Sequence, residues 1–160
     1  MTSGTGSIEA RLQRVEDELA IRRIIEDYAA FLDGRDFKGY VSLFAPDGNW
    51  TNAVGSYTGQ DAIYQMLLDD VGVDGAPNRN NFHIITNERI DIDGDTAKST
   101  CRYLFIFPSK TRQPVTALAG LYQDEFVRLE NGWKIKRREA IEVLPTHDEW
   151  EKLFSLKTDS

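Results

Sequence analysis

The chain has 160 residues, of which 41% are apolar and 28% charged, and its net charge at pH 7 is -7. This length and composition predict one soluble globular domain and exclude a disordered, collagen-like or membrane-spanning class, since no apolar run approaches the ~18 residues of a membrane helix. The acidic balance disfavours a nucleic-acid partner, because phosphate contacts require clustered Lys and Arg.

Cysteine and histidine are scarce. Cys101 is the only cysteine, so no internal disulfide can form, and the N-terminus carries no secretory apolar segment. These features predict a reducing, cytoplasmic setting. The two histidines, His83 and His147, lie too far apart for a zinc-ligand pair, and the carboxylates do not form a calcium-binding loop. We therefore expect neither a metal site nor a cofactor.

The first half of the chain predicts helices. Residues 1–7, rich in Gly, Ser and Thr, are expected to be a disordered tail. Apolar residues at helical spacing then predict a long helix over 8–33, with Gly34 as its terminator. A second helix is expected from its N-cap Asp36, and a third within 59–72. Residues 49–54 between them are a short strand candidate.

The second half changes to a period of two. Segments 81–92, 95–107, 114–129 and 132–144 are predicted strands, joined by turns of the Asp-Gly and Asn-Gly type and one loop bounded by prolines. Helices followed by an antiparallel meander indicate an α+β fold with the helices on one face of a sheet. One domain is expected over 8–145, followed by a segment over 146–160 that could form a short helix or a lid.

The Asp-Gly turn allows the face of each residue in the first hairpin to be predicted. If Asp93 and Gly94 are the two loop residues, His83 opposes Leu104 and shares a face with Arg102. Cys101 then lies on the opposite face, which argues against a Cys-His nucleophilic pair. A face with both polar and apolar residues is typical of the wall of a partly hydrated cavity. A one-residue bulge would exchange the two faces.

The segments "YAAFLDGRDFKGYVSLFAPDGNW", "GQDAI", "FHIITNERIDIDGDTAKSTCRYLF" and "ENGWKIKRREA" together resemble the SnoaL-like branch of the nuclear transport factor 2-like superfamily, over residues 8–145. The resemblance implies a cone-shaped α+β barrel, in which a curved antiparallel sheet wraps over about three helices around a cavity. In cofactor-free members such as bile-acid 7-alpha-dehydratase and scytalone dehydratase, a Tyr and an Asp near the end of the first helix meet a His on a strand. Tyr28, Asp33 and His83 match that pattern, whereas the further strand carboxylate or second strand His has no match.

These residues suggest acid-base chemistry. We expect Asp33 to orient His83 as a base, Tyr28 to donate a hydrogen bond to developing negative charge, and Arg102 to fix an oxyanion. Five residues are candidates for binding the substrate: Trp50, Tyr57, Met66, Leu104 and Tyr122. Arg137 and Arg138 are expected at the surface or in an interface.

The expected function is that of a cofactor-independent lyase or isomerase. It would eliminate water, or a small aldehyde by retro-aldol cleavage, from a small hydrophobic substrate that is aromatic or polycyclic. Two alternatives remain open: a non-catalytic binding or assembly module, and an epoxide hydrolase that would use Asp33 and Arg102 but lacks a second pocket Asp. The expected partners are the substrate and further copies of the chain, in a homodimer or higher homo-oligomer, without nucleic acid or membrane.

Overall fold

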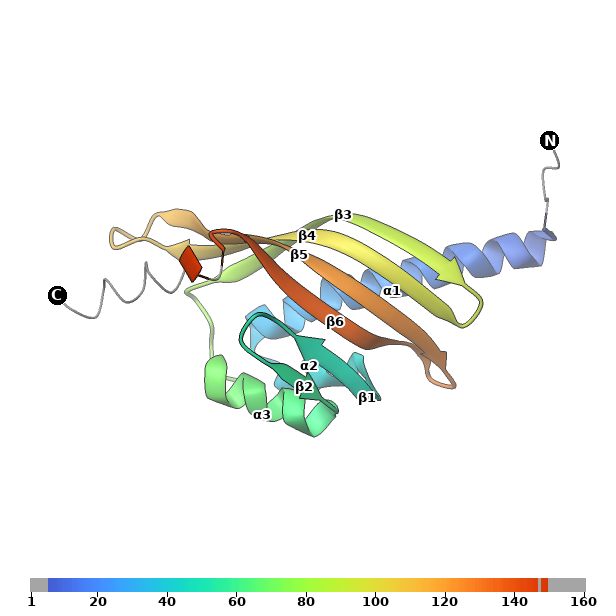
Figure 1. The fold of residues 1–160 in the computed structure, drawn as a ribbon, viewed down its shortest axis with the longest axis horizontal. Helices are drawn as coiled ribbons and strands as arrows, with labels where there is room; N and C mark the ends of the chain where they lie inside the picture. Colours follow the sequence, from blue (N-terminus) through green and yellow to red (C-terminus); the bar gives the residue numbers. More distant parts are fainter. Residues whose placement is uncertain (1–5, 147, 150–160) are drawn as a thin grey trace.

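The computed structural model describes residues 6–146, 148 and 149. Figure 1 shows a curved sheet with the long helix α1 running behind it and the two shorter helices below. The elements follow in the order α1 (Ile8–Gly34), α2 (Phe37–Ser42), β1 (Phe44–Thr51), β2 (Ser56–Thr58), α3 (Gln60–Asp70), β3 (Phe82–Asp93), β4 (Thr96–Pro108), β5 (Pro114–Leu129) and β6 (Gly132–Leu144).

The six strands form one sheet in the order β2-β1-β6-β5-β4-β3. All neighbouring strands are antiparallel except β1 and β6, which are parallel. The predicted α+β plan, with helices on one face of the sheet, is confirmed. The sheet is curved but does not close into a barrel, because β2 and β3 remain as its two edges. None of the described helices covers the face that Figure 1 turns toward the viewer, which we call the outer face.

Helix α1 supplies most of the helical side of the core. Ile21, Ile25 and Tyr28 recur at intervals of four and three residues and are almost fully buried. The helix ends where Arg35 adopts a left-handed conformation (φ 58°) and its backbone N–H bonds to the carbonyls of Phe31 and Leu32. The apolar residues of its first half, from Ile8 to Leu19, do not join this core.

A register shift in β3 reverses the face predicted for His83. Asp93 pairs with Thr96, so the loop residues are Gly94 and Asp95, one step later than predicted. Between the pairs 86–102 and 89–100, β3 advances three residues while β4 advances two, and Asn87 takes a left-handed conformation (φ 59°). His83 therefore pairs with Phe105 and lies on the inner face, the same face as Ile90 and Ile92.

A second register shift changes which residues of β6 point inward. Phe126 pairs with Ile135, but the preceding residue of β5, Glu125, pairs with Arg137, so β6 carries one extra residue at Lys136. Before the shift the odd-numbered Trp133 and Ile135 are buried; after it the even-numbered Arg138 is buried instead. The expectation that Arg138 lies at the surface is wrong for this reason. Arg137, by contrast, is exposed and pairs with Glu139.

Two other predictions concern a membrane-spanning segment and a lid formed by the C-terminal segment. Over residues 6–146, 148 and 149, none of the helices has the length and apolarity needed to cross a membrane. Within the segment 146–160, the Thr146 backbone N–H donates to the Glu149 carboxylate at 2.8 Å. His147 and residues 150–160, on which the predicted lid depends, lie outside the described residues.

Candidate functional site

Asp33, at the C-terminal end of α1, holds His83 at the start of β3 through both of its carboxylate oxygens. Oδ1 lies 2.7 Å from Nδ1 of the imidazole, and Oδ2 accepts the backbone N–H of His83, also at 2.7 Å. Both side chains are mostly buried, with 14% of His83 and 20% of Asp33 exposed. The helix end and the strand are thus fixed to each other at the point where the imidazole enters the interior.

This contact determines the tautomer of the imidazole. An ionised carboxylate can only accept hydrogen bonds, so the proton of neutral His83 lies on Nδ1 and the lone pair on Nε2. The ring of His83 packs against Phe105, with 4.8 Å between the ring centroids. His83 therefore presents an oriented basic nitrogen in an aromatic environment, which is the arrangement that a general base requires.

The loop before β3 supports this pair. The Asn78 side chain donates to the backbone carbonyl of Asp33 and to that of Asn81, both at 3.0 Å. Arg35 donates from Nη1 to the carbonyl of Val71, which ties the end of α1 to the end of α3. The segment that carries Asp33 is therefore restrained from two sides.

The imidazole of His83 lines a cavity of about 410 Å³ between the helices and the inner face of the sheet. A volume of this size lies in the range typical of sites for small organic molecules. Six aromatic residues contribute to its wall: Tyr28, Tyr40, Trp50, Tyr103, Phe105 and Tyr122. Aliphatic residues complete the apolar lining: Leu32, Met66, Leu67, Val71, Leu118 and Ala140.

The tyrosines of the cavity form one connected cluster. Tyr122 stacks on Tyr103 with 4.4 Å between the centroids, and meets Tyr28 edge to face at 5.4 Å. The hydroxyl oxygen of Tyr28 accepts a hydrogen bond from the indole N–H of Trp50 at 2.9 Å. Because that oxygen is already an acceptor, the Tyr28 hydroxyl proton is left to act as a donor.

Arg138 lies behind these rings and is fully buried. Its guanidinium carbon is 3.9 Å from the ring centroid of Tyr28 and 4.6 Å from that of Tyr122. On its other side it makes a bidentate ion pair with Asp124, at 2.7 and 2.8 Å. Such contacts between a cation and aromatic faces are strong when they are desolvated.

The ion pair keeps Arg138 charged. Burial disfavours the cation, but the charge and hydrogen bonds of Asp124 outweigh that effect and raise the pKa of Arg138 above its ordinary value. Ser99 donates a further hydrogen bond to Asp124 at 2.9 Å. One nitrogen of Arg138, Nη1, has no hydrogen-bond partner among the described residues. A fixed positive charge thus lies directly behind the Tyr28 and Tyr122 rings of the cavity wall.

The buried phenols remain protonated. Burial, followed by the proximity of Tyr28, raises the pKa of both Tyr40 and Tyr122 well above the usual value. Burial and the nearby carboxylate of Glu142 raise the pKa of Tyr103 in the same direction. These rings can donate hydrogen bonds near neutral pH, but they cannot act as bases.

Polar residues beyond the predicted set also line the cavity. Glu142 comes from β6, Asn52 follows β1, and Asn81 precedes β3. Glu142 faces inward because it lies beyond the register shift of β6. It supplies a strand carboxylate, which the sequence resemblance did not offer, and Asp70 at the end of α3 supplies another carboxylate to the lining.

The structure brings together most of the predicted site. Tyr28, His83, Trp50, Met66 and Tyr122 all line the cavity. Asp33 lies behind His83 rather than on the cavity wall, as an orienting group would. Tyr57 is not part of the lining; its ring packs on Trp50 with 6.0 Å between the centroids.

Two predicted residues are misplaced, and both errors follow from the register shift in β3. Arg102 pairs with Thr86 and is exposed on the outer face, so it cannot contact a ligand beside His83. Leu104 pairs with Ile84 on that same face. Positive charge is available instead from Arg35, which lines the cavity, and from Arg138 behind the tyrosine rings.

Cys101 was also assigned to the wrong face. It pairs with Tyr122 on the inner side of the sheet and is almost fully buried. Burial raises the pKa of its thiol to about 12, so the thiolate is not formed near neutral pH. The thiol is outside the lining of the cavity. Burial of the thiol, rather than the face on which Cys101 lies, therefore disfavours a Cys-His nucleophilic pair.

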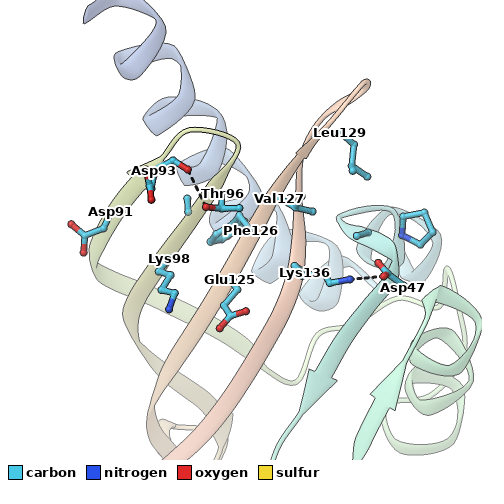
Figure 2. Close-up of a pocket in the computed structure, with 13 residues that line it drawn as sticks. Asp47, Asp91, Asp93, Thr96, Lys98, Glu125, Phe126, Val127, Leu129 and Lys136 are labelled. Carbon is cyan, nitrogen blue, oxygen red and sulfur yellow. Dashed lines mark hydrogen bonds and ion pairs between the residues drawn. The ribbon is translucent and has the colours of Figure 1, made fainter. Parts of the chain in front are cut away.

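A larger hollow, of about 1010 Å³, lies on the outer face. Figure 2 shows Asp91, Lys98 and Glu125 projecting into it from neighbouring strands, and Lys136 in contact with Asp47 at its edge. These charged side chains are largely exposed to solvent, and no cluster of metal-ligating residues occurs in the described part of the chain. The smaller cavity is the candidate active site, because its lining includes the oriented imidazole of His83, whereas the lining of the larger hollow contains no histidine.

Comparison with known proteins identifies the family of the chain. A family model described as a SnoaL-like domain matches residues 13–139. An uncharacterised protein of Mycobacterium tuberculosis is 33% identical over 132 residues, which cover 78% of this chain and 84% of that protein.

Two solved structures share the fold. A scytalone dehydratase-like protein from Novosphingobium aromaticivorans is 27% identical with a TM-score of 0.68, and the match covers 81% of this chain and 86% of that chain. The hexachlorocyclohexane dehydrochlorinase LinA-type3 from Novosphingobium barchaimii is 22% identical with a TM-score of 0.67, covering 82% and 90%.

Proposed function

Since this chain belongs to the SnoaL-like domain family of the nuclear transport factor 2-like superfamily, we propose that it is a cofactor-independent lyase or isomerase. Its substrate would be a small hydrophobic molecule with an aromatic or polycyclic skeleton, held in the cavity beside His83. The observation that carries the proposal is the contact of Asp33 with both the backbone and the imidazole of His83. His83 also contributes to the lining of the aromatic cavity, which a histidine with a purely structural role would not need to do.

In an elimination, Nε2 of His83 takes a proton from a carbon next to a carbonyl or an aromatic ring. The electrons of that C–H bond form a double bond, and the bond to the leaving hydroxyl breaks. The imidazolium, or another protonated group, supplies the proton with which the hydroxyl leaves as water. In a retro-aldol cleavage, Nε2 instead takes the hydroxyl proton, a carbon–carbon bond breaks, and a small aldehyde leaves.

Both reactions place negative charge on the part of the substrate that accepts the electrons. The Tyr28 hydroxyl can donate a hydrogen bond to this charge, and the Arg138 cation adds a favourable electrostatic field from behind the Tyr28 and Tyr122 rings. Both groups are already oriented before a substrate binds, so they need no rearrangement during the reaction. General acid-base help of this kind accelerates reactions by roughly two to four orders of magnitude.

The names of the structural neighbours support the reaction class. The dehydratase-like protein and the dehydrochlorinase both bear names of enzymes that eliminate a small leaving group. The epoxide hydrolase alternative loses support, because Arg102, which it would use with Asp33, lies on the outer face. The remaining alternative is a binding module that retains its ligand unchanged.

A screen of β-hydroxy ketones and related ring compounds in D₂O tests the proposal. Wild type is expected to exchange a substrate C–H for deuterium or to form an eliminated product, detected by NMR and mass spectrometry. His83→Asn should lower the rate by roughly two to four orders of magnitude, and Lys98→Gln, on the outer face, should not change it. Equal rates for wild type and His83→Asn would exclude His83 as the base, and recovery of bound but unchanged ligand would favour the binding module.

A further inference from the structure

The first half of α1 carries an apolar stripe that the described part of the chain leaves uncovered. Its residues are Ile8, Leu12, Val15 and Leu19, with exposed fractions of 75, 55, 54 and 62%. We call this set the α1 stripe. Figure 1 shows that this part of α1 projects beyond the sheet toward the N-terminus. Four large apolar side chains so exposed on one projecting helix are characteristic of an interface.

The side of α1 that packs on the sheet is the side opposite the stripe. There Asp17 is buried, with Arg128 bound to both of its oxygens at 2.6 Å and the Trp133 indole donating to it at 3.0 Å. At 100° per residue, the stripe lies between about 160 and 220° around the helix from Asp17. The polar residue therefore faces the protein body and the apolar residues face away from it, so the stripe is not a misplaced part of the core.

The spacing of the stripe is that of a coiled-coil seam. Steps of four, three and four residues place Leu12 and Leu19 at heptad positions a, and Ile8 and Val15 at positions d. At the next two positions of the seam, Arg22 and Glu26 replace the apolar residues, so the seam ends at Leu19. Leu at position a with β-branched residues at position d favours coiled coils of more than two helices.

The charges beside the stripe indicate the direction in which copies would pair. In a parallel arrangement, position g of one helix faces position e of the next heptad in its neighbour. Arg11 then faces Glu16, and Glu18 faces Arg23, so all the pairs are attractive. In an antiparallel arrangement Arg11 would face Glu18, which is attractive, but Glu9 would face Glu16, which is repulsive. The flanks therefore favour a parallel arrangement of identical chains.

From this geometry we propose that the α1 stripes of several copies of this chain associate as a short parallel helical bundle. Two heptads are too few to hold isolated peptides together. Here the helix is already formed, because Asp17, Arg128 and Trp133 anchor it to the sheet. The protein bodies lie on the outside of the bundle, since each is attached to the face of α1 opposite its stripe.

Site-specific cross-linking tests the arrangement. Leu12→Cys places identical thiols in one layer of a parallel bundle, so mild oxidation should give a disulfide-linked dimer of the full chain. Ala20→Cys, exposed but outside the stripe, should not cross-link. The native Cys101 does not interfere, because it is buried and the pKa of its thiol is about 12. A link that forms only when Leu12→Cys and Val15→Cys proteins are mixed would show an antiparallel pair and overturn the proposal.

A second measurement separates the interface from the fold. Leu12→Glu with Leu19→Glu should reduce the mass measured by light scattering without changing the circular dichroism, because neither residue is part of the core. Glu16→Arg should weaken Leu12→Cys cross-linking, and the added change Arg11→Glu should restore it. An unchanged mass in the double glutamate variant, or no restoration by the charge exchange, would refute the bundle.

Discussion

Asp33 and His83 make two hydrogen-bonding contacts of equal length, 2.7 Å, one through the main chain of His83 and one through its ring. The same carboxylate thereby fixes where β3 begins and which nitrogen of the imidazole carries the proton. Structure and chemistry depend on one side chain at this point, so a change at Asp33 is expected to affect both.

The tautomer of His83 can be observed directly. Long-range ¹H–¹⁵N NMR spectra should show neutral His83 protonated at Nδ1, because Asp33 accepts that proton. The spectra are simple to assign, since the chain has only two histidines. Asp33→Asn should shift the population toward the other tautomer, whereas Asp91→Asn on the outer face should not. Predominant Nε2 protonation in wild type would contradict the assigned role of Asp33.

Arg138 and Asp124 should each be far more costly to remove alone than together. Arg138→Met leaves the Asp124 carboxylate buried without its counter-ion, and a loss of about 3–5 kcal/mol of unfolding free energy is expected. Arg138→Met combined with Asp124→Leu removes both charges and should recover most of that loss. Urea unfolding measures both values. A single-variant cost under about 1 kcal/mol would mean that the pair is not buried as described.

Gly120 makes room for the ring of Tyr103. A Cβ atom at position 120 would lie 2.2 Å from two ring carbons of Tyr103, so Gly120→Ala must displace that ring from its stack on Tyr122. Overpacking of this kind costs about 1–3 kcal/mol. Near-ultraviolet circular dichroism and urea unfolding should both change. Gly34→Ala, where no atom lies within 4 Å of the added Cβ, is the control.

Asp17 should contribute to stability in a limited range of pH. Hydrogen bonds from Arg128 lower the pKa of this carboxyl from 3.8 to about 2, against the opposing effect of burial. Because the folded-state pKa is the lower one, the contribution is present above pH 4 and is lost as the pH falls from about 4 to 2. The shift corresponds to about 2 kcal/mol. Wild type should lose this much more stability than Asp17→Asn over that range; parallel pH profiles would contradict it.

We propose that the outer face of the sheet, which the described helices leave uncovered, is a second surface through which copies of the chain associate. Leu121 pairs with Ile141 on that face, and Arg102 lies beside Leu121. Leu121→Lys with Ile141→Lys should lower the mass found by light scattering, whereas Lys98→Gln should not. A monomeric wild-type protein would contradict this expectation. The substitutions in the α1 stripe change other residues than the substitutions on the outer face, so the two surfaces can be tested independently.

Much of the fold was predictable because it depends on periodicity and turn chemistry. Asp36 caps α2 as expected, its side chain accepting the Gly39 N–H at 2.8 Å, and the four long strands lie close to the predicted ranges. Tyr28, Asp33 and His83 were also identified, since their types and order match the family. The partners of His83 across the sheet were not, because a register shift does not alter the local pattern that predicts a strand.

The pattern of buried residues in β6 explains why the sequence did not predict that Arg138 is buried. The buried residues of β6 change from odd-numbered Trp133 and Ile135 to even-numbered Arg138, and Ala140 continues the even series in the cavity wall. Such a change of parity within one strand indicates an extra residue. In the sequence, Ile141 obscures this change of parity, because it is apolar and continues the odd-numbered series. The paired Asp124 gives no further indication, since alternation alone does not distinguish a buried carboxylate from an exposed one.

The two register shifts give the active site a sensitivity that substitution experiments do not detect. Deletion of one residue between Thr86 and Arg89 would rotate the first part of β3 by half a turn, and His83 would face solvent although every remaining side chain is unchanged. Deletion of Lys136 would do the same to Arg138 and Glu142. In this scaffold, single-residue insertions and deletions can therefore exchange the whole chemical lining of the cavity at once. Relatives that differ by one residue in these strands are where a change of reaction should be sought first.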